Sequence, residues 1–219
     1  MADRKIIIAG YDTAANGWTL ASCNLSSAVA IESYAQVPGR SGRLDLSTVL
    51  TDGEPCYDNR TFTARLETSE GTRLERETRI DALMHTFHGR RWNIFLPDDT
   101  SHYITGRISI TKEYNDNAHA AVTIKANCDP WRYSTQQKTI MVRALSTEQT
   151  VSLSNNGGMP VIPTVTVTED SVTLSGEGWS RVLTKGTYTL PDLYMKQETI
   201  EVTYKGSGDI TFAYREAVL

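Results

Sequence analysis

The sequence predicts a mostly β protein of two domains, with one amphipathic helix in the first domain. Three observations support this prediction: apolar and polar residues alternate along several segments, turn-forming clusters separate those segments, and one segment has the period of a helix. With 219 residues, of which 39% are hydrophobic, the chain is long enough to build two modest cores.

The strand pattern is clearest after residue 103. Turn-like clusters lie at 96–100, 115–117, 155–158 and 206–209. Between them, apolar residues recur at every second position, which is typical of antiparallel strands with one face on a core. The residues on the expected core faces are Ile104, Gly106, Ile108, Ile110, Ala120, Val122, Ile124, Ala126, Val165, Val167, Ile210, Phe212 and Tyr214.

The helix is predicted over 72–88. Thr72 followed by Glu75 forms the pattern of a capping box, and Gly89 stands where a helix often ends. The apolar residues have helical spacing and should pack on the sheet; they are Ile80, Leu83, Met84 and Phe87.

The boundary between the domains is expected in the segment 127–134, where Asp129-Pro130 should stop a strand. We therefore predict an N-terminal β domain, residues 1–133, and a C-terminal β-sandwich, residues 134–219. The second domain contains only strand-like segments rich in Thr and Val. Each domain is expected to fold independently.

The charge pattern argues against binding to nucleic acid. The formal net charge is −4, with 15 basic and 17 acidic residues up to Tyr133 and 7 and 9 beyond it, so neither part is basic. The longest apolar run near the start has four residues, against roughly 7–15 in a signal peptide. We therefore expect a protein that is made in the cytoplasm, is not secreted and does not enter a membrane.

No pattern predicts an enzyme, a cofactor or a metal site. His85 and His88 end the helix, where the helix dipole favours cations, and no third metal ligand lies near them in sequence. Asp98 and Asp99 lie in a predicted turn, where aspartates cap backbone amides. Among the tryptophans, only Trp179 is kept as a candidate ligand contact, because it follows Gly-Glu-Gly in an expected loop.

Two passages resemble a known family. The first is the run Val-Pro-Gly-Arg-Ser-Gly-Arg-Leu-Asp-Leu-Ser at 37–47, and the second comprises Gly-Thr-Tyr-Thr-Leu-Pro-Asp-Leu at 186–193 and Phe-Ala-Tyr-Arg-Glu at 212–216. Cys-Asp-Pro at 128–130 lies at the junction between them. This order of motifs resembles the distal tail protein, or baseplate hub, of long-tailed bacteriophages and prophages.

The resemblance implies a structural virion protein with a galectin-like C-terminal sandwich. It implies a homo-hexameric ring at the tip of the tail, around a channel through which DNA passes without specific binding. The implied partners are the tail tube protein, the tail fibre or tail-associated lysin protein, and receptor-binding proteins at the periphery. The galectin sugar-binding signature is not recognisable in this chain.

The segment Pro38–Asp52 is expected to contact the neighbouring subunit. Pro38 and the glycines make it a turn-rich projection, and its aliphatic side chains exceed what its own domain needs to cover. The predicted contact residues are Pro38, Arg40, Arg43, Leu44, Leu46, Val49 and Leu50. The alternative is an ordinary hairpin packed on its own sheet.

Two other functions remain open on the sequence alone. The first is a lectin-like carbohydrate-binding module, which would be a monomer that binds glycan through Trp179. The second is a small hydrolase that uses Asp98 or Glu113, for which no complete set of catalytic groups is visible.

Overall fold

The computed structural model describes residues 5–51 and 53–219. By its internal contacts the chain divides into two compact units, one ending at Arg132 and the other beginning at Tyr133. The predicted fold class is confirmed: the chain is mostly β, and one α-helix occurs in the described residues. None of the described helices is long and apolar enough to span a membrane.

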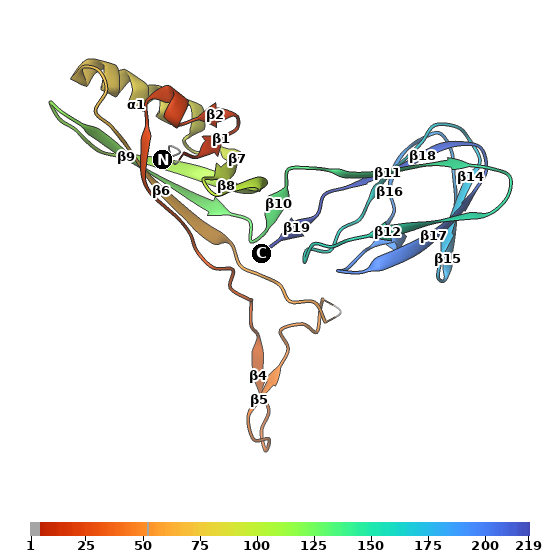
Figure 1. Cartoon of the computed structure of the whole chain (residues 1–219). Helices are drawn as coiled ribbons and strands as arrows, with labels where there is room; N and C mark the ends of the chain where they lie inside the picture. The colour runs from red at the N-terminus through yellow and green to blue at the C-terminus, as the bar shows by residue number, and fades with distance from the viewer. Residues whose placement is uncertain (1–4, 52) are drawn as a thin grey trace. The chain divides into compact units, whose positions relative to one another are not determined.

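The first unit is an antiparallel sheet with strands in the order β2-β1-β7-β8-β9-β6-β3. Two pairings join strands that are distant in sequence, β1 with β7 and β9 with β6, and the other neighbours are consecutive among the strands of this sheet (Figure 1). The bounds are β1 Ile7–Ile8, β2 Tyr11–Asp12, β3 Thr19–Leu25, β6 Arg60–Thr68, β7 Arg91–Leu96, β8 Asp99–Asn115 and β9 Ala120–Cys128. A 3-10 turn, η1 (Ala14–Asn16), follows β2.

The predicted alternation holds along the central strands. Ile104, Ile108 and Ile110 are buried on β8, and Ile124 opposes Ile110 across the pair with β9. Gly106 is required by the packing, because a Cβ there would lie 2.5 Å from the buried Cys128 sulfur. Burial raises the pKa of the Cys128 thiol to about 11, which leaves this cysteine unreactive at neutral pH.

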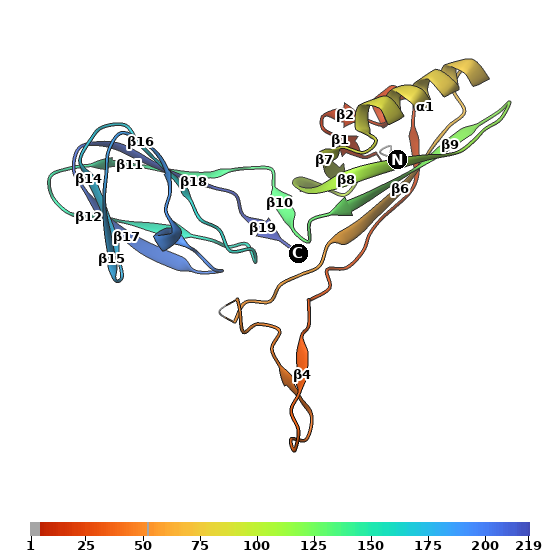
Figure 2. The same cartoon turned by 180° about the vertical axis from the view of Figure 1, so that it is seen from behind.

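Helix α1 (Arg73–Phe87) lies across one face of this sheet, as the two opposite views show (Figures 1 and 2). The predicted capping box is present: the Glu75 amide donates to the Thr72 hydroxyl at 3.3 Å, and the Thr72 amide donates to the Glu75 carboxylate at 2.7 Å. Ile80, Leu83 and Phe87 are buried and Met84 is partly buried against the same core. The helix therefore packs as its period predicts.

One buried helix residue was not predicted. Arg76 is 1% exposed and occupies the core-facing position one turn before Ile80. Its guanidinium donates to the carbonyl of Gly71 at 2.5 Å and to that of Asp116 at 2.8 Å. Buried charges are tolerated when hydrogen bonds satisfy them, so Arg76 ties the start of α1 to the turn between β8 and β9.

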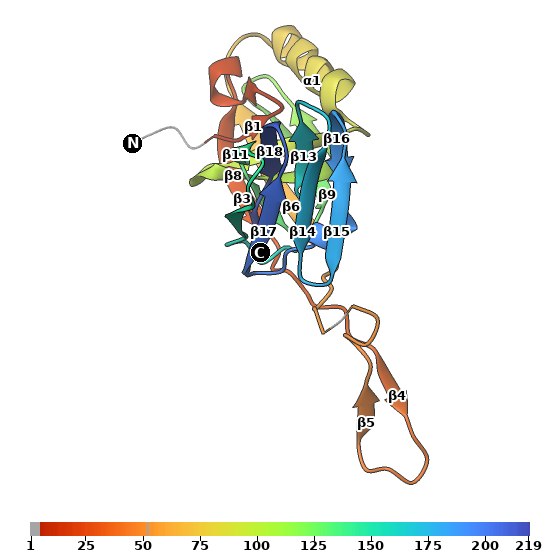
Figure 3. The ribbon, with the colours of Figure 1, turned by 90° about the vertical axis from the view of Figure 1, so that its right-hand side faces the viewer.

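The second unit is a sandwich of two four-stranded antiparallel sheets, ordered β11-β18-β13-β16 and β12-β17-β14-β15 (Figure 3). Their bounds are β11 Lys138–Ala144, β12 Gln149–Ser154, β13 Thr164–Val167, β14 Val172–Gly176, β15 Trp179–Leu183, β16 Gly186–Thr189, β17 Thr199–Lys205 and β18 Gly208–Tyr214. Short elements complete the chain: β10 Arg132–Ser134, η2 Pro191–Leu193 and β19 Ala217–Val218.

The sandwich has a core of its own. One sheet contributes Val165, Phe212 and Ile210 to it, and the other contributes Leu174 and Val202. All five side chains are fully buried. The Tyr214 hydroxyl also donates to the carbonyl of Ser154 at 2.7 Å, linking β18 to the end of β12. These contacts lie within residues 133–219, so they do not depend on the first unit.

We predict that a fragment of residues 133–219 folds alone, because its core is complete without the first unit. Such a fragment should unfold cooperatively in urea and should appear as a stable product of limited proteolysis of the whole chain. A fragment with random-coil circular dichroism, together with digestion that leaves no stable product beginning near residue 133, would contradict this prediction.

Candidate interaction surfaces

The chain between β3 and β6, residues 26–59, forms a projection that we call the arm. It contains a small hairpin of its own, β4 (Tyr34–Gln36) and β5 (Arg43–Asp45), which is not part of the sheet of the first unit. Figures 1 and 3 show this hairpin at the end of two extended stretches of chain, away from that sheet. The alternative of a hairpin packed on its own sheet is therefore not what the structure has.

Local hydrogen bonds hold the arm together. The Leu46 amide donates to the Ser33 carbonyl at 2.8 Å, and the Ser33 amide donates to the Ser47 hydroxyl at 2.9 Å. Hydrogen bonds from the hydroxyl and the amide of Ser47 hold the pKa of Asp45 below its ordinary value. Gly39 and Gly42, with φ of 79° and 80°, permit the left-handed turns at the hairpin tip.

No residue in the described part of the arm is buried. Seven of the fifteen large apolar side chains that are exposed among the described residues belong to this short segment, and Leu50 is 96% exposed. The seven are Val29, Ile31, Tyr34, Val37, Leu46, Val49 and Leu50. Such a concentration of apolar surface is typical of an interface, because isolated domains rarely expose it.

The structure places the predicted contact residues on this arm. Pro38, Arg40 and Arg43 are exposed at or beside the tip, and Leu44 is half-buried opposite Ala35 in the hairpin. The predicted segment ended at Asp52, which lies outside the described residues. The arm begins earlier than predicted: the apolar side chains at 29–37 were missed, although Val29 and Ile31 alternate as a strand face would.

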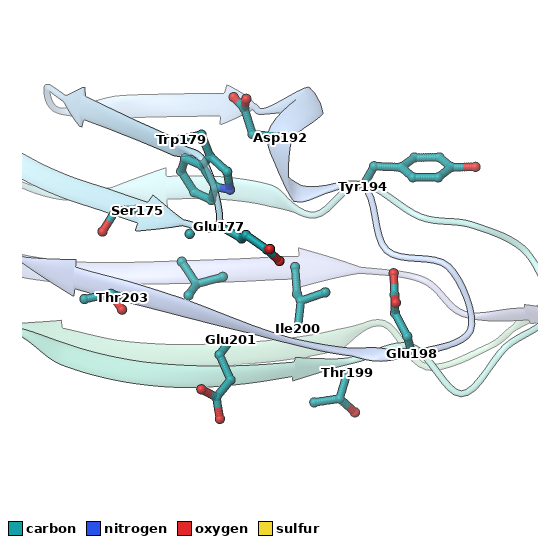
Figure 4. A pocket seen from close by; sticks show the side chains of 12 residues that line it. Ser175, Glu177, Trp179, Asp192, Tyr194, Glu198, Thr199, Ile200, Glu201 and Thr203 are labelled. Atoms are coloured by element: carbon teal, nitrogen blue, oxygen red, sulfur yellow. The ribbon is translucent and has the colours of Figure 1, made fainter. Parts of the chain in front are cut away.

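A cleft of about 610 Å³ lies in the second unit around Trp179 (Figure 4). Its walls come from the β14–β15 turn, η2, the segment that follows η2, and β17. Gly176 makes room for the indole, because a Cβ at this position would lie 2.6 Å from the Trp179 ring nitrogen. The lining residues are Ser175, Gly176, Glu177, Trp179, Asp192, Tyr194, Glu198, Thr199, Ile200, Glu201, Val202 and Thr203.

Three of the candidate catalytic and metal-binding residues, His88, Asp99 and Glu113, have structural partners. The His88 ring Nδ1 accepts the Ile110 amide at 3.0 Å, which closes the end of α1 on β8. The Asp99 carboxylate accepts hydrogen bonds from the backbone amides of Ser101 and His102, at 3.1 and 3.0 Å, as expected of an aspartate in a turn. Burial raises the pKa of Asp99, but hydrogen bonds, first from the His102 ring, bring it below its ordinary value.

The carboxylate of Glu113 likewise has protein partners. It accepts hydrogen bonds from the Thr123 hydroxyl and, at 2.8 Å, from the Arg65 guanidinium, and these bonds lower its pKa. Within residues 5–51 and 53–219, no group of three His, Cys, Asp or Glu side chains could hold a metal ion.

Comparison of the fold with solved structures gives whole-chain matches, while no family model and no curated sequence matches the chain. The Dit protein of phage SPP1, described as a paradigm of the hub adsorption apparatus in phages that infect Gram-positive bacteria, has a TM-score of 0.64. The match covers 98% of this chain and 99% of that one, at 16% identity. A chain of the phage P2 baseplate, in its activated conformation with calcium, has a TM-score of 0.55 and 8% identity, covering 99% and 98%. The fold expected from the resemblance to distal tail proteins is thus confirmed over both units.

Proposed function

We propose that this chain is a non-enzymatic structural protein of a bacteriophage tail. In this proposal six copies form a hub ring at the distal end of the tail, which places the protein at the tail tip of the virion. The observation that carries the proposal is the fold likeness to the SPP1 hub protein, which extends over nearly the full length of both chains. A likeness that covers both units is more informative than one limited to a sandwich, because β-sandwiches occur in many unrelated proteins.

The arm supplies a physical reason for assembly. A closed ring needs contacts between two different surfaces of each subunit, and a projecting arm provides one of them. Outside the arm, the exposed large apolar side chains found in the described part of the first unit are Leu74 and Tyr114. Little exposed apolar surface is therefore found in the first unit outside the arm, and we expect the arm to be buried against a neighbouring copy.

The ring would connect the tail tube protein to the tail fibre or tail-associated lysin protein, with receptor-binding proteins at its periphery. DNA would pass through its channel. A net charge of −4 is compatible with this role, because a conduit should not retain the phosphate backbone. A monomer that binds glycan would support the lectin-like alternative, so the state of assembly helps to distinguish the two functions.

Light scattering coupled to size-exclusion chromatography tests the proposal. The expected result is a particle of six times 24.3 kDa, with a ring visible by electron microscopy. A monomer that persists at the highest protein concentrations and does not form rings would contradict the proposed hub and favour the lectin-like alternative.

A further inference from the structure

We propose that the cleft around Trp179 binds a lysine or arginine side chain from a basic segment of another protein. The lining of the cleft lies wholly within residues 175–203 of the second unit, whereas the arm belongs to the first. That the basic segment belongs to a tail protein rests on the function proposed above. The preference of the cleft for a cation does not depend on that function.

The charge of the lining carries the first step of the argument. Four carboxylates line the cleft, from Glu177, Asp192, Glu198 and Glu201, and no lysine, arginine or histidine is among the lining residues. One of the four is neutralised from outside the lining, because Arg181 Nε lies 3.1 Å from Asp192. The remaining three give the lining a net negative charge, which a bound cation would offset.

The directions of the side chains carry the second step. Figure 4 shows Glu177 and Glu198 pointing from opposite walls toward the same opening beside Trp179, whereas Glu201 points away from it. The Glu177 carboxylate makes no hydrogen bond with the described residues, and Glu198 accepts one, from the Lys196 amide at 3.3 Å. Both therefore retain free acceptor positions, to which an ammonium or guanidinium group can donate.

The aromatic wall carries the third step. Trp179 is half-buried, and Tyr194, 46% exposed, stands at the rim. An indole ring attracts a cation through its negatively charged face, most strongly where water is partly excluded. The cleft thus has carboxylates on two sides and an indole on a third. Lysine and arginine side chains complement this lining, because they are positively charged and donate hydrogen bonds without accepting any. A neutral sugar can donate to the same carboxylates but does not offset their charge, so the lining favours the cation.

The cleft can be observed directly in the full-length protein. With 5-fluorotryptophan incorporated, the four tryptophans give separate fluorine signals, and the Trp179→Phe variant identifies that of Trp179. The probe is an acetylated, amidated Gly-Lys-Thr-Arg-Gly peptide, and the neutral control is the same peptide with glutamine in place of both basic residues. A tetramer of N-acetylglucosamine serves as the sugar.

The basic peptide should shift the Trp179 signal in a saturable titration, whereas the neutral peptide and the sugar should not. Glu177→Gln and Glu198→Gln should each weaken binding about tenfold, in the range measured for charges that pair across interfaces. Glu169→Gln is the matched control: it removes an exposed acid of the same unit outside the cleft and should change binding less than about twofold.

Three results would overturn the proposal: no shift with millimolar basic peptide, an equal shift with the neutral peptide or the sugar, or equal weakening by Glu169→Gln. The absence of a shift excludes basic peptides as ligands, and an equal shift with a control ligand assigns the cleft to another class of ligand. Equal weakening by Glu169→Gln shows that binding depends on the overall charge of the unit and not on the cleft. Sedimentation of the same samples reports the ring separately, so failure of this proposal and failure of the hub proposal are distinguishable.

Discussion

Replacing Leu44, Leu46 and Leu50 by serine is expected to abolish the ring while leaving both units folded. Leu50 and Leu46 are 96% and 37% exposed. Leu44 is half-buried in the small hairpin of the arm and is not among the residues that pack against either core, so none of the three belongs to a core within the subunit. An aliphatic side chain gains roughly 1.5–3 kcal/mol on full burial, and partial burial within the arm reduces the total for three to about 3–6 kcal/mol per interface. Such a loss raises the dissociation constant about 10²- to 10⁴-fold.

Sedimentation velocity measures the loss of the ring, and circular dichroism measures the retained fold. Leu74→Ser is the matched control, because Leu74 is 77% exposed but lies on α1 rather than on the arm; this variant should still form rings. Two outcomes count against the arm as the interface. If the triple variant unfolds, its leucines stabilise their own subunit, and if it still forms rings, the subunits contact one another elsewhere.

Truncating Phe87 to alanine is expected to lower the free energy of unfolding of the first unit by about 3–5 kcal/mol. Phe87 is 3% exposed, and its ring packs edge-on against Tyr11 and Trp92, at centroid distances of 5.4 and 6.1 Å. The truncation leaves a cavity between the end of α1 and the sheet, and neighbours held by strand pairing cannot fill it.

Urea unfolding followed by tryptophan fluorescence measures this change, since three of the four tryptophans lie in the first unit. The experiment is best done in the background of the arm variant, so that assembly does not contribute to stability. Leu74→Ala, on the exposed side of the same helix, should change the free energy by less than about 0.5 kcal/mol. A loss below about 1 kcal/mol for Phe87→Ala would place the end of the helix outside the core.

The features that could be predicted from the sequence are those that depend on residues close to one another along the chain. The capping box joins Thr72 and Glu75, three residues apart, and the helical and strand periods repeat within a few residues. Buried Ile80, Leu83 and Phe87 follow directly from such a period. Local hydrogen bonding and the alternation of faces hold whatever the rest of the chain does, so a pattern of this kind predicts its element reliably.

Arg76 shows where local patterns fail. A charged residue in an amphipathic helix predicts a solvated face, yet Arg76 is buried because the carbonyl of Asp116, forty positions later, is brought within 2.8 Å of it. The pairing of β8 with β9 determines the position of this carbonyl, and no feature near Arg76 in the sequence indicates it.

For the candidate surfaces, too, some features could be predicted from local sequence and others could not. The sequence by itself determined that 38–52 is turn-rich and carries aliphatic side chains, because composition and turn chemistry are local properties. It placed Trp179 in a loop, which is wrong, since Trp179 is the first residue of strand β15. Only the tertiary structure decided that the arm leaves its sheet, and that Glu177 and Glu198 point at one opening beside Trp179. The physical reason is that exposure and convergence depend on which distant segments pack together, and the pairing of β14 with β17 joins parts of the chain that no local pattern connects.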